Sequence, residues 1–201
     1  MEKLKKMTWP NVILLALITA IYTGIVMCFD VLDNTSIQDI GVAFECWFVF
    51  AIFIVVNCKK PVEAALKCFV FFLISQPLIY LIQVPFNPLG FGIFMYYKHW
   101  FILTLLTLPG GAIAWLLTKK NWLSALILCV PQAYMAEMAV CYGIMAKNHF
   151  PHHIISAIFC LALAILFPAK LLDERKHKIF CWTVAAVVLV AALFVPSLRL
   201  L

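Results

Sequence analysis

Four polar side chains lie inside long apolar stretches of the sequence, where a lipid bilayer would offer them no hydrogen-bond partners. They are Gln76, Gln132, Glu137 and Glu45. Carboxyl and amide groups at such depth are costly against lipid, so we expect them to face the interior of a helix bundle or a wet cavity. There they would bind a small solute, and the carboxyl of Glu137 would carry a proton or pair with a cationic group.

Helix-breaking residues accompany two of these side chains. Five positions near the middle of three successive apolar stretches are predicted to kink or open their helices: Pro77, Pro109, Gly110, Gly111 and Pro131. A proline removes a backbone donor and frees a carbonyl one turn earlier. Gln76 and Gln132 are immediate neighbours of two of the prolines. Because transporters bind solutes at broken helices, the stretches 62–84, 100–118 and 122–146 are predicted to line a midplane cavity.

Other residue types that often do chemistry form no recognisable set. His149, His152 and His153 gather between two apolar stretches, where histidines of the membrane interface are the simpler interpretation. The eight cysteines include no Cys-x-x-Cys pair, and most lie in or beside apolar stretches as small buried hydrophobes do. We therefore expect no metal site, no catalytic residue and no cofactor.

Composition excludes a soluble domain. The 201 residues are 66% hydrophobic and 12% charged, whereas soluble domains are about half apolar and about a quarter charged. Apolar stretches long enough to cross a bilayer recur along the whole chain. The sequence predicts an all-α, polytopic integral membrane helix bundle that forms a single transmembrane domain over residues 1–201. About seven transmembrane helices are expected, at residues 10–29, 41–57, 62–84, 100–118, 122–146, 154–172 and 179–195.

Basic residues indicate how these helices are oriented. With the N-terminus inside and the C-terminus outside, every Lys and Arg falls on the inner side except Lys98, Lys147 and Arg199. Such an excess marks the cytoplasmic side of a membrane protein, so the net charge of +6 does not indicate nucleic acid. Lys67 is expected to extend its amine to the inner surface. With no sorting motif, the predicted location is the inner (cell) membrane.

The function predicted from these features is the binding or transport of a small solute through the midplane cavity. No ATP-binding loop is present, so energy would come from an ion gradient, a proton on Glu137 or a partner subunit. One alternative is an oligomeric pore, or an accessory subunit of a larger membrane complex. Another is an intramembrane enzyme acting on lipid or peptide, although the sequence holds no clustered acid and base, nucleophile or metal set.

Overall fold

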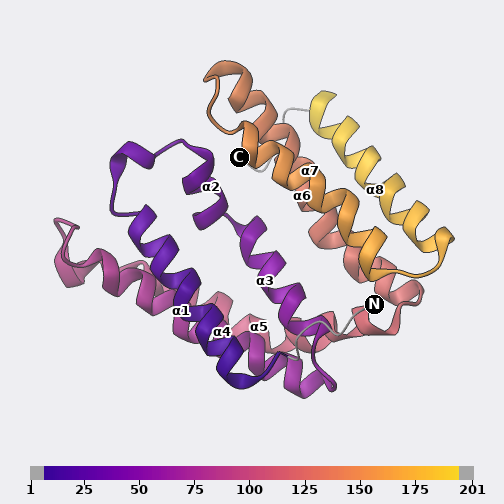
Figure 1. Cartoon of the computed structure of the whole chain (residues 1–201), viewed down its shortest axis with the longest axis horizontal. Coiled ribbons are helices and arrows are strands. Elements are labelled where there is room, and N and C mark those ends of the chain that lie inside the picture. The colour runs from indigo at the N-terminus through magenta and orange to yellow at the C-terminus, as the bar shows by residue number, and fades with distance from the viewer. Residues whose placement is uncertain (1–6, 195–201) are drawn as a thin grey trace. The chain divides into compact units, whose positions relative to one another are not determined.

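The computed structural model describes residues 7–194, and within them every regular element is a helix. The long helices are α1 (Trp9–Val26), α3 (Phe44–Val56), α4 (Pro61–Gln83), α5 (Tyr97–Ala114), α6 (Trp122–Asn148), α7 (Ile154–Leu171) and α8 (Arg175–Phe194). The shorter elements are η1 (Asp30–Leu32), α2 (Ser36–Val42), η2 (Gly90–Met95) and η3 (Trp115–Lys119) (Figure 1). Arg199, predicted to lie outside, falls beyond the described residues.

Six of the helices in the described part are long and apolar enough to cross a bilayer. The helices α2 and α3 meet at a bend of 47° and make a seventh span if they are taken together. The predicted fold class is therefore confirmed, and the chain is an all-α, multi-pass membrane protein. The helix α8 begins at Arg175, ahead of the predicted start at residue 179.

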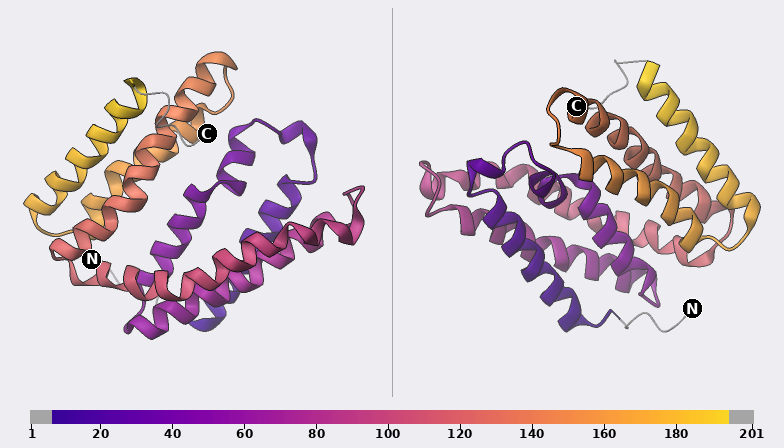
Figure 2. Two further views of the ribbon diagram at one scale, coloured as in Figure 1. Left: turned by 180° about the vertical axis from the view of Figure 1, so that it is seen from behind. Right: turned by 45° about the horizontal axis from the view of Figure 1, so that its top comes forward.

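Contacts divide the chain into two compact units. Unit 1 consists of Met1–Asp33 and Gly41–Trp115, and unit 2 of Asn34–Ile40 and Leu116–Leu201. In unit 1 the central helix is α4, which packs against α1 and α5 and more lightly against α3. In unit 2 the central helix is α6, with α7 and α8 packed along it (Figure 2). The single transmembrane domain over the whole chain stays a prediction.

Residues at the helix starts explain why the main helices begin where they do. Pro10 and Pro61 occupy the first turns of α1 and α4, where a missing N–H costs nothing. Ahead of α6, the Asn121 side chain accepts a hydrogen bond from the Ser124 N–H at 3.1 Å, and Ser124 Oγ accepts one from the Asn121 N–H at 3.2 Å. This capping box satisfies two backbone donors that the helix itself leaves unpaired.

The three mid-span prolines do not open their helices, whereas a kink at each of them stays a prediction. Pro77, Pro109 and Pro131 each lie inside a continuous α-helix, respectively α4, α5 and α6. A proline in a helix interior removes one hydrogen bond, and here the flanking turns continue the helix past it. The predicted open helices are therefore replaced by uninterrupted helices that each lack one internal bond.

The two glycines after Pro109 have different surroundings. A Cβ atom on Gly111 would lie 3.1 Å from the Ala65 Cα and 3.2 Å from the Ala64 carbonyl oxygen, while one on Gly110 would meet no atom within 4 Å. Gly111 therefore lets the backbones of α4 and α5 approach closely, as small residues do between membrane helices. Its role is in packing and not in opening the helix.

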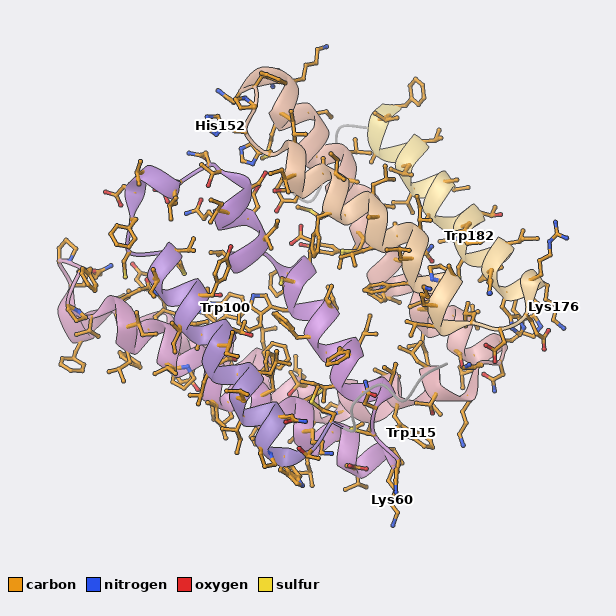
Figure 3. The ribbon with its side chains drawn as sticks, viewed as in Figure 1. Lys60, Trp100, Trp115, His152, Lys176 and Trp182 are labelled. Carbon is orange, nitrogen blue, oxygen red and sulfur yellow. The ribbon has the colours of Figure 1, made fainter. Side chains whose placement is uncertain are left out.

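In an up-and-down helix bundle, the ends of neighbouring helices lie side by side, and polar contacts join such ends within each unit. In unit 1 the Trp115 indole N–H donates to the Cys58 carbonyl at 3.1 Å, so the ends of α3 and α5 meet (Figure 3). In unit 2 the Lys120 amine lies 2.8 Å from an Asp173 carboxylate oxygen, joining the start of α6 to the turn between α7 and α8. Which side of the membrane each end faces rests on the distribution of basic residues.

Lys67 is 3% exposed, and its amine extends towards the first turn of α4, where it is covered by neighbouring residues. Its amine donates at 2.5 Å both to the Met7 carbonyl and to Glu63 Oε1, and it lies 5.6 Å from the Trp9 ring centroid. Lys67 thus ties the chain ahead of α1 to the first turns of α4.

We expect Lys67→Met to lower the free energy of unfolding by about 1–3 kcal/mol, because two charge-assisted hydrogen bonds disappear. Unfolding in mixed micelles with increasing denaturing detergent would measure the change. Lys59→Met removes an exposed amine from the same region and should leave stability nearly unchanged. Equal effects of the two substitutions would show that the buried contacts of Lys67 add no stability.

Candidate functional site

The four predicted polar residues are all buried, and they are divided between the two units. Gln76 on α4 and Glu45 on α3 belong to unit 1, whereas Gln132 and Glu137 both lie on α6 of unit 2. Each pair is therefore described within its own unit.

Gln132 makes an interhelical hydrogen bond that a proline explains. Its Nε2 donates to the Ala164 carbonyl oxygen on α7 at 2.8 Å. In a regular helix this carbonyl would accept from the N–H of residue 168, but that residue is Pro168, which has none. The amide of Gln132 therefore supplies the donor that α7 lacks, and this side chain has a structural role that its place beside Pro131 does not indicate.

The other end of the same amide is left without a partner. Gln132 is 0% exposed, and no hydrogen bond reaches its Oε1 atom. The amide cannot be reversed, because the Ala164 carbonyl only accepts and must face the NH₂ group. An acceptor thus stays buried and unsatisfied in the middle of α6, which is the most deeply buried of the six long spans. Unsatisfied groups of this kind are uncommon and often mark a functional position.

Glu137 lies five residues beyond Gln132, which corresponds to about 7.5 Å along the axis of α6 and about 140° around it, so the two side chains lie on different faces of the helix. It is 7% exposed and lies well inside the 27-residue helix. A carboxyl group at this position of a membrane-spanning helix is expensive to bury, so it is a functional candidate by default. The helix α6 therefore carries two buried polar side chains within its span, Gln132 and Glu137.

In unit 1, Gln76 and its neighbour Ser75 also carry buried atoms without hydrogen-bond partners, Nε2 and Oγ respectively. Glu45 has a different setting from the predicted one, because α3 begins at Phe44 and places Glu45 in its first turn. The helix dipole and the free N–H groups of a first turn favour a carboxylate. Contact of Glu45 with a solute stays a prediction.

A cluster that the sequence interpretation missed lies at the N-terminus of α7. Asp39 Oδ2 is 2.7 Å from His153 Nδ1 and accepts a hydrogen bond from Ser156 Oγ at 2.6 Å. The Tyr142 ring stacks on the His153 ring at a centroid distance of 5.9 Å. A carboxylate only accepts hydrogen bonds, so the proton of this pair is on His153 Nδ1.

The order of these contacts does not make a hydrolytic triad. In such a triad the serine hydroxyl bonds to the histidine, whereas Ser156 donates directly to the carboxylate. The Ser156 N–H also donates to Ser36 Oγ at 3.3 Å. Ser36 therefore accepts a hydrogen bond from a free N–H in the first turn of α7, and Asp39 attaches the segment Asn34–Ile40 to this helix through the side chains of His153 and Ser156.

We expect Asp39→Ala to release this segment from α7, since His153 and Ser156 would lose their common acceptor. Each buried donor left unsatisfied costs about 1–3 kcal/mol. Limited proteolysis should then cut between residues 30 and 40 faster than in the wild type. Asp33→Ala, in the same polar stretch, is the control, and equal cleavage of the two variants would contradict the role of Asp39.

His177 is a second group whose setting the sequence did not indicate. It falls between the predicted spans 154–172 and 179–195, yet it lies in the first turn of α8 and is 2% exposed. Its ring packs edge-on against the Trp122 ring at a centroid distance of 4.4 Å. Neither ring nitrogen has a hydrogen-bond partner, and Nε2 is 3.9 Å from Glu174 Oε2. The Lys176 amine, bonded to that carboxylate, lowers the pKa of Glu174 and keeps it ionised.

Among residues 7–194, no group of three or more His, Cys, Asp or Glu side chains is placed to hold a metal ion. A shallow, open groove follows one apolar face of α8, and its lining residues are Ile179, Trp182, Thr183, Ala186, Val187, Val190 and Ala191. The best-supported polar positions in the described residues are therefore Gln132 and Glu137, two separate buried positions on α6. The chain matches no model of a protein family, no curated protein and no solved structure.

Proposed function

We propose that this multi-pass membrane protein binds or transports a small solute that carries hydrogen-bond donors, at Gln132 and Glu137 on α6. The observation that carries the proposal is the unsatisfied Oε1 atom of Gln132. A buried acceptor without a partner costs about 1–3 kcal/mol, and a donor from a solute would remove that cost. Since Nε2 is already engaged with Ala164, the amide has only its oxygen to offer a ligand.

The chemistry of the two groups suggests the class of solute. An amide oxygen accepts hydrogen bonds, and an ionised carboxylate accepts them and attracts positive charge. An amine or ammonium group supplies both donors and charge, so a cationic amine fits this position better than an anion does. A proton on Glu137 would compete with such a cation and would couple its binding to pH.

The remaining parts of the proposal concern the setting of this site. The excess of basic residues in the predicted inner segments supports an N-terminus on the inner side and a location in the inner (cell) membrane. Gln76 on α4 is proposed as a polar contact of unit 1 by itself, where its buried Nε2 would donate to an acceptor on a solute. Partner subunits would supply energy if an ion gradient does not.

Thermal stabilisation by a library of small amines and quaternary ammonium compounds tests the proposal. Wild-type protein in lipid nanodiscs should be stabilised by some of them, because ligands that bind only the folded state raise its stability. With Glu137→Gln, the amine concentration needed for the same stabilisation should rise at least about tenfold, because the carboxylate that would pair with the bound amine is lost. Glu174→Gln is the matched control, because Glu174 is exposed and lies outside the spans. If Glu137→Gln responds as the wild type does, the site is wrong.

A further inference from the structure

One end of unit 2 gathers basic side chains from three parts of the chain. They are Lys119, Lys120, Lys170, Arg175, Lys176 and Lys178. The ion pair between Lys120 and Asp173 brings the turn before α6 to the turn before α8. The two carboxylates at this end are both occupied, because Asp173 pairs with Lys120 and Glu174 pairs with Lys176 at 2.8 Å. This end of unit 2 therefore keeps a clear excess of positive charge.

The groove on α8 begins at Ile179, one helical turn beyond Arg175. Its residues follow one another at spacings of one, three or four, and Arg175 lies four residues before Ile179 on the same face of the helix. From Ile179 to Ala191 the groove is about 18 Å long. The hydroxyl of Thr183 is bonded to the Ile179 carbonyl at 2.9 Å, so the groove presents an apolar surface. Figure 3 shows Lys176 at the start of α8 and Trp182 further along it.

We propose that this groove and its basic end bind an anionic phospholipid. The phosphate would lie against Arg175 and Lys178, and one acyl chain would follow the groove towards Ala191. Arginine pairs with phosphate through two parallel hydrogen bonds, and each basic residue near a membrane surface contributes about 1 kcal/mol of attraction to anionic lipid. A zwitterionic lipid has no net charge to match this end. The occupant follows from charge complementarity, and it is independent of the solute proposed for α6.

Native mass spectrometry of the whole protein, released from nanodiscs of phosphatidylglycerol and phosphatidylcholine, tests the inference. Wild-type protein should retain phosphatidylglycerol in preference to phosphatidylcholine. Arg175→Gln with Lys178→Gln should lower that preference at least about fivefold, as expected for the loss of about 1 kcal/mol or more. The matched control is Lys59→Gln with Lys60→Gln, which removes two charges from the same predicted side of the membrane in unit 1.

A second variant tests the groove separately from the charge. Ala186→Phe fills the middle of the groove, faces away from the packed helices and leaves every charge in place. It should also release phosphatidylglycerol. An equal loss in the Lys59 and Lys60 control, no loss in the Arg175 and Lys178 variant, or unchanged binding in Ala186→Phe would each overturn the proposed site.

Discussion

Gly111→Leu is expected to destabilise unit 1 by about 3 kcal/mol, the upper part of the range for overpacking a tightly packed contact. The Cβ atom alone would lie 3.1 Å from the Ala65 Cα and 3.3 Å from the Cys68 Cβ, and these neighbours belong to the central helix α4. Because backbone atoms cannot turn aside as a flexible side chain can, α5 would have to move away from α4. Helix propensity favours leucine over glycine and offsets only about 0.5–1 kcal/mol of the loss.

Gly110→Leu is the matched control, since it makes the same chemical change one residue earlier, where the added atom meets open space. It should leave stability unchanged or raise it slightly. Thermal unfolding of both variants in the same nanodiscs measures the difference. Similar losses at the two positions would mean that the glycines act through the helix backbone and not through the contact between α4 and α5.

Gln132→Leu is expected to leave the Ala164 carbonyl without a donor, at a cost of about 1–3 kcal/mol that the loss of the unsatisfied Oε1 atom partly offsets, and Pro168→Ala is expected to remove that cost. The reason is that alanine at position 168 returns the N–H that the Ala164 carbonyl lacks, so the Gln132 amide is no longer needed there. A double-mutant cycle over the two positions should therefore show a coupling energy of about 1 kcal/mol or more. Additive effects would contradict the proposed rescue of a proline by a glutamine.

The same pair separates the structural role of Gln132 from its proposed binding role. The double variant Gln132→Leu with Pro168→Ala should fold as stably as the wild type and still fail to respond to amines, because it lacks the Oε1 acceptor. If the double variant regains both stability and ligand response, Gln132 acts only in packing. In that case Glu137 alone would remain as the proposed contact.

The transmembrane helices could be predicted because their apolar stretches are long and are separated by short basic turns. The face that each helix buries could not be predicted, because apolar residues surround these helices and leave no amphipathic stripe. Gly111 shows the consequence, since its sequence context indicates a flexible break and only the neighbouring α4 makes it a packing residue. The pairing of Gln132 with the carbonyl freed by Pro168 is hidden for the same reason.

Polar contacts between residues far apart in the chain could not be predicted from the sequence either. Asp39 and His153 are separated by 114 residues, and neither lies in a motif that would connect them. Lys67 follows the usual pattern of a lysine near a helix end, but its hydrogen bond to the Met7 carbonyl, 60 residues earlier in the chain, could not be predicted. The bend of 47° between α2 and α3, just ahead of Glu45, likewise could not be predicted from the sequence.

Native mass spectrometry of the protein gently extracted from its own membrane tests the proposed solute site most directly. We expect a monomer with a bound small molecule that carries an amine or another hydrogen-bond donor. This molecule should be absent from Glu137→Gln and from the double variant of Gln132 and Pro168. A bare homo-oligomer, or a stoichiometric complex with a partner protein and no small molecule, would contradict the solute site and favour a pore or an accessory subunit.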